Sequence, residues 1–407
     1  MTRSERFPSV EDRVKLYMSN WYLPPCNGSK GSVDERLKYT YDFTADELYP
    51  DVHLSSYRDN RTIAQLDTKI RPDHPAALWE NALDPCYLPR FKNSYCPDAR
   101  KMATLAKEIT GSKTLAKLPP IIVQYGDGIR KRFQKTNVLF INKFREAATQ
   151  SALEEVTDPE SGLDCNVRGR KKLHHGGSDS DEVFSPIVWL LNYRRHYRAV
   201  PSVKWIDSPW EMKTNMAIWR GQLTGHLHLS ATEKGKSFME KCDMLPRCKL
   251  VRKYLDSPAL DIGMSGQCSQ LRIDDENRRM IKGRKTITEH MRYKAIISIE
   301  GNDVASGLKW ALYSRSVVLM PPPTKTSFLM EELLVPWIHY VPLKEDLSDV
   351  EEKMNWVIDN DQKARHIAER ATLFIHDLLF HEDAEKDNLD IQKEILRRYL
   401  TFFAPDK

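Results

Sequence analysis

Three short polar turns in this chain of 407 residues each follow a run of apolar residues, and their side chains are of types that handle charged groups. The turns are Gly126-Asp127-Gly128 after Ile121 to Tyr125, Arg220-Gly221 after Met216 to Trp219, and Glu300-Gly301-Asn302-Asp303 after Ala295 to Ile299. Sheets of parallel strands present their chemistry at the carboxyl ends of the strands. We therefore look for a site among these turns.

Arg220 offers a fixed positive charge and a planar fork of donors that pairs bidentately with phosphate oxygens. The alternative is a surface arginine held in an ion pair. Asp127 offers a carboxylate that can take a proton from a hydroxyl group, while an aspartate that only caps a glycine turn is its alternative. His196 and Asp207 are the next candidates for a general base.

The turn from Glu300 to Ser306 joins a glycine to a helix predicted over Val304 to Tyr313, so its backbone N–H groups can hold phosphate or ribose. Glu300 can accept hydrogen bonds from ribose hydroxyls, and Lys309 lies one turn into the helix. Capping of the helix by Asn302-Asp303 is the alternative, and the two roles are compatible. The residues expected to line this turn are Gly301, Asn302, Val304, Ala305 and Ser306.

The elements that must position these turns follow an alternating pattern. A strand is predicted over Ser316 to Met320, a strand over Ile187 to Leu191, and helices over Ala103 to Lys117, Asp349 to Asn360, Gln362 to Leu379 and Ile391 to Phe403. Strands that alternate with helices indicate parallel βαβ units. The first hundred residues are rich in Pro, Tyr, Asp and Asn and are interpreted as irregular and loop-rich.

The composition excludes several classes of protein. The chain has 41% hydrophobic and 29% charged residues, and 62 basic against 57 acidic residues give a net charge of +5, which does not indicate nucleic-acid binding. No run approaches the ~18 apolar residues of a membrane span, and Met1 to Asn20 lacks the apolar centre of a signal peptide. A length of 407 residues favours two domains.

The seven cysteines contain no CxxC pair, so a zinc site of the usual spacing is not expected, whereas disulfides are possible. His174-His175 lies in a polar, glycine-rich stretch, interpreted as an exposed loop in preference to a metal site. Asn27 and Asn60 begin glycosylation sequons that matter only in a secretory lumen.

Longer stretches of the chain resemble the family 90 glycosyltransferases. They are YKAIISIEGNDVASGLKWAL, SRSVVLMPPP and MEELLVPWIHYVPLKEDLSDVEEKMNW, preceded by WEMKTNMAIWRGQLTG and IVWLLNYRRHY. The resemblance runs from Trp189 to Phe380, and more loosely over Leu118 to Asp127. Its order and spacing carry more weight than a lone Glu-Gly-Asn or Trp-Arg-Gly.

The resemblance implies an α/β protein of the GT-B type, with two Rossmann-like domains and an active site in the cleft between them. Residues 1–100 and 101–205 would form the acceptor side, residues 206–380 the UDP-sugar-binding domain, and residues 381–407 a terminal helix. It also implies inverting transfer without a metal or other cofactor, from a UDP-sugar to a protein or glycan acceptor, with glucose or xylose as the sugar and a monomeric enzyme.

The resemblance carries roles onto particular residues. Asp127 matches the family's general base, although Gly126 stands where the family commonly has arginine. The implied donor-binding residues are Asn215, Arg220, Gly221, Glu300, Gly301, Asn302, Val304, Ala305, Ser306 and Lys309, and the implied loop residues are Asn192, Arg195 and His196. The rival interpretation is a non-catalytic sugar- or nucleotide-binding protein that has lost its base. The sequence does not decide between two locations of the protein, the secretory lumen and the cytoplasm.

Overall fold

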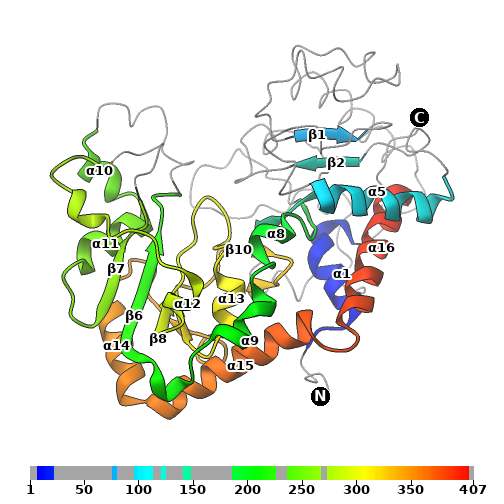
Figure 1. Ribbon diagram of the computed structural model, residues 1–407. Coiled ribbons are helices and arrows are strands. Elements are labelled where there is room, and N and C mark those ends of the chain that lie inside the picture. Colours follow the sequence, from blue (N-terminus) through cyan, green and yellow to red (C-terminus); the bar gives the residue numbers. More distant parts are fainter. Residues whose placement is uncertain are drawn as a thin grey trace, which may run out of the picture. The chain divides into compact units, whose positions relative to one another are not determined.

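The computed structural model describes residues 7–22, 76–79, 96–112, 121–124, 141–147, 186–225, 236–266 and 273–402 (Figure 1). They belong to two compact units, which we describe separately. Residues 195–324 and 331–381 form the parallel-sheet unit, and residues 5–194, 325–330 and 382–407 include the mixed-sheet unit.

The parallel-sheet unit is built on five strands in the order β11-β9-β8-β6-β7. Every neighbouring pair in this sheet is parallel. The strands are β6 (Thr214–Gly221), β7 (Leu260–Met264), β8 (Tyr293–Ile297), β9 (Val317–Met320) and β11 (Val341–Pro342). The α/β class and its parallel sheet are thus confirmed.

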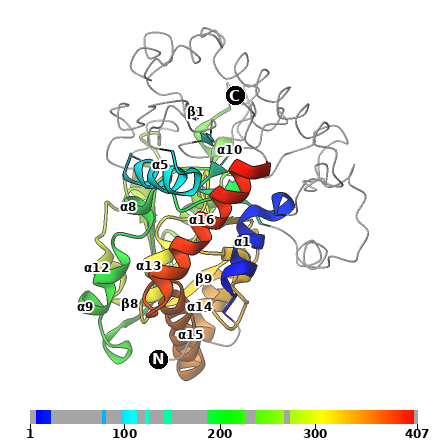
Figure 2. The ribbon, with the colours of Figure 1, turned by 90° about the vertical axis from the view of Figure 1, so that its right-hand side faces the viewer.

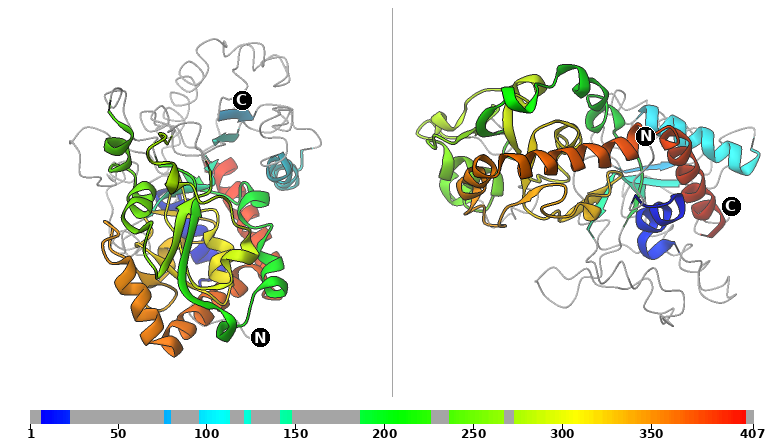
Figure 3. Two further views of the ribbon diagram at one scale, coloured as in Figure 1. Left: turned by 60° about the vertical axis from the view of Figure 1, so that its left-hand side comes forward. Right: turned by 90° about the horizontal axis from the view of Figure 1, so that it is seen from below.

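The helices of this unit connect and cover the strands (Figure 3). They are η4 (Val200–Ser202), α9 (Val203–Ile206), η5 (Trp210–Met212), α10 (Phe238–Cys242), α11 (Pro246–Tyr254), η8 (Arg278–Met280), α12 (Ile287–His290), α13 (Leu308–Tyr313), η9 (Glu331–Leu333), α14 (Val350–Asp359) and α15 (Asp361–Leu379).

Both faces of the sheet are buried, because side chains alternate along each strand. Ala217 and Trp219 of β6 join one hydrophobic core with residues of α11 and α14. Ile218 of β6 and Ile296 of β8 are buried as well but lie outside that core, on the other face. Each fully buried aliphatic side chain contributes about 1.5–3 kcal/mol.

The order of the strands creates a topological switch point, which is the place in the sheet where the chain reverses the direction in which it adds strands. The chain starts at β6 in the interior of the sheet, adds β7 on one side, and then adds β8, β9 and β11 on the other. Connections that leave neighbouring strands in opposite directions open a crevice at the carboxyl ends of those strands. That crevice belongs between β6 and β8.

The mixed-sheet unit contains a four-stranded sheet in the order β1-β2-β3-β5, in which β1 is antiparallel to β2 and the other neighbours are parallel. A second sheet pairs β4 with β10. The strands are β1 (Ala76–Trp79), β2 (Ile121–Gln124), β3 (Ile141–Asn142), β4 (Phe144–Glu146), β5 (Ile187–Val188) and β10 (Lys325–Ser327).

Helices from both ends of the chain pack together in the mixed-sheet unit, where α16 contacts α1 and α5 (Figure 2). Arg13 of α1 is fully buried, donates to Asn388 Oδ1 over 2.5 Å and faces the Phe328 ring. The helices are α1 (Val10–Met18), η1 (Ser19–Trp21), α5 (Cys96–Thr110) and α16 (Ala384–Phe402), and α8 (Tyr193–His196) begins in this unit.

Most of the predicted elements are confirmed, with shifted ends. Two expectations were wrong. The first hundred residues contain α1 and β1 and are not wholly irregular. The helix predicted from Val304 begins only at Leu308, because Val304 to Gly307 form a turn that Leu308 N closes on Ala305 O over 3.1 Å.

Within the described part of the chain, none of the helices is both long enough and apolar enough to cross a membrane.

Candidate active site

The connections that follow β6, β8 and β9 meet at the carboxyl edge of the parallel sheet, defined here by residues 222–225, 298–307 and 321–324. Gly225 N donates to Asn302 Oδ1 over 2.7 Å, which joins the connection after β6 to the one after β8. Thr324 donates to the Glu300 carboxylate through its backbone N (3.0 Å) and its hydroxyl (2.5 Å), which joins the connections after β8 and β9. The predicted turn after β8 is therefore in contact with the connection after β6. The turn predicted at Arg220-Gly221 was wrong, because these two residues pair with β7 as the last residues of strand β6.

Glycines allow this close contact. Gly225 has φ of +102°, a conformation that side chains with a Cβ seldom adopt. A Cβ on Gly301 would overlap Thr224 Oγ1 and lie 2.9 Å from Arg247 Nη2. Gly221 serves packing as well, since a Cβ there would lie 2.5 Å from the ring of Trp219. The glycines at these positions are required by the local geometry.

Arg220 forms the ion pair that the sequence left open as an alternative to phosphate binding. Its Nη2 lies 2.5 Å from Asp261 Oδ1, while Nη1 donates to the carbonyls of Trp219 (2.9 Å) and Asp261 (2.7 Å). The side chain is only 4% exposed, so the pair is buried and not at the surface. Arg220 Nε has no hydrogen-bond partner among the residues that the structure describes.

Asp261 links Arg220 to two further side chains. Tyr293 donates its hydroxyl to Asp261 Oδ2 over 2.6 Å, and Lys285 Nζ lies 3.7 Å from the same oxygen. Burial acts to raise the pKa of Asp261, but the hydrogen bonds from Tyr293 and Arg220 outweigh it and lower that pKa. Burial and the bond to Asp261 raise the pKa of Tyr293 to about 12. Asp261 therefore stays ionised and holds the guanidinium in place.

The residues of the turn after β8 lie together at the carboxyl edge as expected. Val304 and Ala305 are buried, whereas Gly301, Asn302 and Ser306 are partly exposed. Because α13 begins only at Leu308, the backbone N–H groups of residues 301–306 belong to this turn and not to a helix.

Two predicted donor-binding residues lie elsewhere. Lys309 is fully buried, and its Nζ forms an ion pair with Glu331 Oε1 at 2.6 Å. Asn215 lies near the amino end of β6, about 20 Å along the strand from Gly221 at 3.3 Å per residue. The structure does not bring Asn215 to the carboxyl edge.

The other predicted residues are distributed over both units. Asn192 is buried with φ of +58° just before α8, Arg195 is exposed, and His196 is buried. Asp207, a reserve candidate for the base, is held by Lys213 Nζ at 2.5 Å and by Arg315 N at 2.6 Å. Asp127 and the pair His174-His175 lie outside the described residues.

Among the described residues, one group with metal-ligating side chains comes together, His381, Glu382 and Asp383. They are consecutive in the sequence, and exposed acidic groups of this kind are common without a metal. We assign no metal to them.

Four residues that contact the predicted site residues were missed by the sequence analysis, namely Thr224 and Thr324 of the carboxyl edge, Arg247 of α11 and Asp261 near the amino end of β7. Asp261 carried a signal, because a charged residue within the apolar strand Leu260 to Met264 needs a partner. The others show no local pattern, since they act through residues distant in the sequence.

Comparison with known proteins agrees with this geometry. The sequence model of glycosyl transferase family 90 matches residues 202–387, which contain all five strands of the parallel sheet. The chain is 42% identical over 168 residues to O-glucosyltransferase LpsA of Dichelobacter nodosus, covering 41% of this chain and 44% of that protein. It is 30% identical over 242 residues to protein O-glucosyltransferase 3 of Rattus norvegicus, covering 58% of this chain and 46% of that protein.

A further relative is protein O-glucosyltransferase 3 of Homo sapiens, 30% identical over 159 residues that make up 38% of this chain and 30% of that protein. In each case the chain spans less than half the length of the relative. The connections after β6 and β8 lie inside the region, residues 202–387, that matches glycosyl transferase family 90.

Proposed function

We propose that the parallel-sheet unit binds a UDP-sugar at the carboxyl edge between β6 and β8, and that the enzyme transfers its sugar to a hydroxyl group of a protein or glycan. The observation that carries this proposal is the contact between the turns after β6 and β8 at the switch point of a doubly wound sheet. Nucleotides bind at such switch points in open α/β sheets. The relatives named O-glucosyltransferases support glucose as the transferred sugar, and xylose is the second candidate.

The chemistry requires stabilisation of the leaving diphosphate. Cleavage of the bond between sugar and diphosphate builds positive charge on the sugar and negative charge on the leaving group. Gly301 N donates to Asp303 O within the turn, so the backbone N–H groups proposed to bind the diphosphate are those of Asn302 and residues 304–306, and Arg220 supplies positive charge beside β7. In our proposal, Arg220 moves part of its guanidinium from Asp261 to the phosphate when the donor binds.

The acceptor hydroxyl must lose a proton as it attacks the sugar. We assign this step to Asp127, which follows β2 by three residues in the chain, with a GT-B arrangement of the two units and inversion at the anomeric carbon. Attack forms the bond from the acceptor oxygen to the anomeric carbon, breaks the bond to the diphosphate, and transfers the proton to Asp127.

A donor screen tests the proposal. The protein is incubated with UDP-glucose, UDP-xylose or UDP-galactose, and both the UDP released and the intact mass of added acceptors are measured. We expect slow release of UDP with one donor in the absence of acceptor. Failure to release UDP from any donor, together with retained binding of UDP, would favour a non-catalytic sugar-nucleotide-binding protein.

A pair of glycine variants ties the activity to the carboxyl edge. Gly301→Ala must displace Thr224 or Arg247, whereas at Gly266, after β7, the new Cβ of an alanine would have no atom of the described residues within 4 Å. We expect Gly301→Ala to weaken UDP binding by at least tenfold, since displacements near 1 Å disrupt a built site. Gly266→Ala should bind as the unchanged protein does. Equal binding by both variants would move the donor site away from this edge.

A further inference from the structure

Arg247 is a side chain from a third element that bonds to both turns of the carboxyl edge. It is the second residue of α11, and its guanidinium spreads over the connections after β6 and β8. On the β8 side, Nη2 donates to Ile299 O over 2.7 Å and Nε donates to Glu300 O over 3.1 Å. On the β6 side, Nη1 donates to Thr224 Oγ1 over 2.6 Å and to Gln222 O over 3.3 Å.

These bonds fix the spacing of the two turns. Gly301 lies against Thr224 and Arg247 with no room for a Cβ, and Gly225 N bonds to Asn302. Movement of the guanidinium would therefore release both turns together. The guanidinium presents five N–H donors from three nitrogens in a fixed planar fork, whereas the ammonium of lysine presents three donors from a single nitrogen.

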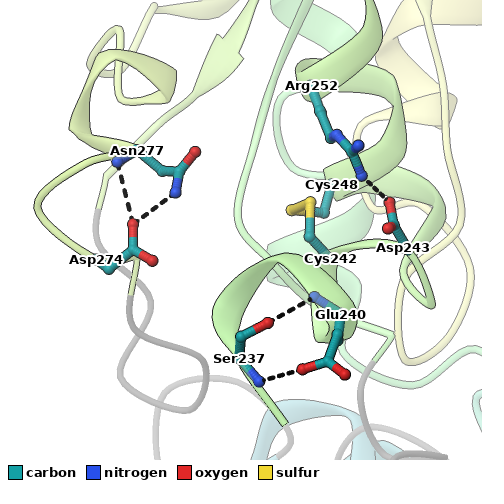
Figure 4. Close-up of a disulfide and its surroundings, with 8 residues drawn as sticks. All are labelled: Ser237, Glu240, Cys242, Asp243, Cys248, Arg252, Asp274 and Asn277. Atoms are coloured by element: carbon teal, nitrogen blue, oxygen red, sulfur yellow. Dashed lines mark hydrogen bonds and ion pairs between the residues drawn. A yellow bond between two sulfur atoms is a disulfide. The ribbon is translucent and has the colours of Figure 1, made fainter.

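A disulfide holds the segment that carries Arg247. Cys242, the last residue of α10, is bonded to Cys248 in the first turn of α11, and both cysteines are fully buried (Figure 4). Arg247 lies inside the short loop that this bond closes. The loop is also anchored by Leu245, which is buried and whose carbonyl accepts from Cys248 N over 2.9 Å.

The other end of α10 is fixed independently. Ser237 and Glu240 form a reciprocal capping box at its start, with bonds of 3.3 Å and 2.7 Å (Figure 4). Cleavage of the disulfide would thus free the connection between α10 and α11 while leaving the start of α10 in place. The segment that gains freedom is the one that carries Arg247.

We propose that Arg247 is a positioning residue for the donor site, and that the Cys242–Cys248 disulfide makes the affinity of this site for the donor dependent on redox state. The inference rests on the proposed function for its ligand. In the reductive step, a dithiol such as dithiothreitol gives two electrons and two protons to the disulfide, which becomes two thiols, and the dithiol becomes a cyclic disulfide.

The experiment compares Arg247→Ala, Arg247→Lys and the double variant Cys242→Ser/Cys248→Ser with the control Arg252→Ala. Arg252 lies on the same helix, is 47% exposed and pairs with Asp243 (Figure 4). The first measurement is hydrogen exchange at the amides of residues 222–225 and 298–303. We expect faster exchange in both stretches for Arg247→Ala and for the cysteine variant, a smaller effect for Arg247→Lys, and none for Arg252→Ala.

The second measurement is the affinity for UDP by calorimetry. Loss of a residue that orients a metal ligand typically weakens metal affinity by 10–100-fold, and we expect a loss of UDP affinity of at least about tenfold for Arg247→Ala, since Arg247 orients the turns in the same way. Dithiothreitol should weaken UDP binding by the unchanged protein and leave the affinity of the cysteine variant as it was. The KM for the donor should rise more than kcat falls, which a general loss of stability would not produce.

The two measurements separate this inference from the proposed function. If the unchanged protein does not bind UDP, the proposed function fails, and hydrogen exchange still decides whether Arg247 and the disulfide fix the turns. Unchanged exchange in a folded Arg247→Ala protein would overturn the positioning role. If Arg247→Ala does not fold, equal exchange and equal UDP affinity in Arg247→Lys would overturn it. UDP affinity insensitive to dithiothreitol, with the thiols shown by mass to be reduced, would overturn the redox dependence.

Discussion

At the scale of single residues, Arg220 shows how one side chain serves two candidate roles. In this structure its guanidinium bonds to Asp261, which Tyr293 also holds. The residue type suits phosphate as well as carboxylate, because both present a pair of oxygens to the same fork of donors. In the proposed site, the phosphate of the donor therefore competes with the Asp261 carboxylate for the guanidinium of Arg220.

Arg220→Ala should lose both UDP affinity and turnover. A lost donor at a site that stabilises developing charge typically lowers the rate by ~10²–10³. Calorimetry with UDP and turnover of the donor measure the two effects, and thermal unfolding reports the loss of the pair with Asp261. The control is Arg279→Ala, whose side chain is 70% exposed and pairs with Asp256. Unchanged UDP binding by Arg220→Ala would remove this residue from the site.

Asp127→Asn tests the proposed base. Asparagine preserves the shape and removes the basicity, so transfer should fall by the ~10²–10⁴ that a general base contributes. Donor affinity should stay within about twofold, because the carboxylate faces the acceptor in the proposed geometry. Asparagine caps helices about as well as aspartate does. Near-normal transfer by a folded Asp127→Asn protein would leave only a capping role, and His196 and Asp207 would be tested next.

At the scale of elements, a buried ion pair attaches α13 to η9. Lys309 and Glu331 are 0% and 2% exposed, so neither charge is stabilised by water. Removal of one partner of such a pair usually costs about 3–5 kcal/mol, whereas replacement of both by apolar residues costs much less.

Lys309→Met should therefore lower the free energy of unfolding by about 3–5 kcal/mol, and Lys309→Met/Glu331→Leu should recover much of that loss. Chemical denaturation measures both. UDP affinity of the folded double variant should stay within about twofold if Lys309 acts only through Glu331. A tenfold loss of affinity would instead make Lys309 a direct contact of the diphosphate.

A second element-scale prediction concerns Asp98 in the first turn of α5. It accepts a hydrogen bond from Tyr193 N at 3.2 Å, and burial raises its pKa from 3.8 to about 6. Between these two values the folded state binds more protons than the unfolded state. Asp98 therefore makes the free energy of unfolding fall as the pH rises from about 4 to about 6, by roughly 1–3 kcal/mol.

Asp98→Asn should remove that decline, because the amide does not titrate. We expect the variant to gain stability over the unchanged protein at pH 7 and to show little gain at pH 4. Urea denaturation at the two pH values measures the difference. An equal gain in the free energy of unfolding at pH 4 and at pH 7 would show that the ionisation of Asp98 does not affect the stability of the protein.

At the scale of the whole molecule, the donor site is proposed to work without a metal. The adjacent carboxylates Asp274 and Asp275 are occupied locally, because Asp274 accepts from Asn277 N over 3.0 Å (Figure 4) and Asp275 pairs with Arg278. They cap a polar turn and do not follow a strand. Positive charge for the diphosphate is assigned to Arg220 instead.

Turnover should therefore survive EDTA. The test is the release of UDP from the preferred donor before and after chelation, with manganese added back as the control. Loss of turnover with EDTA and its return with manganese would contradict both the metal-free chemistry and the GT-B arrangement proposed with it.

The sequence by itself determined the local elements and the family. Apolar runs such as Ala295 to Ile299 and the turns that follow them are local patterns, so the strands, their alternation with helices and the family resemblance were all readable from the chain. The start of α13 was misplaced because the turn from Ala305 to Leu308 is closed by one hydrogen bond that leaves no pattern in the sequence. Asn215 and Lys309 were assigned to the site by the family resemblance, and their places in the fold, near the amino end of β6 and in a buried ion pair, do not follow from it.

Only the tertiary structure decided which residues meet. The order of strands puts β8 beside β6, and this pairing brings Gly225 to Asn302 and Arg247 to both turns, across 23 to 77 positions of sequence. Strand order depends on how both faces of the sheet are covered, which is a property of the whole core. The partners of Arg220, Lys309 and Arg247 follow from that order, because a buried charge or donor takes the acceptor that the packing places within reach.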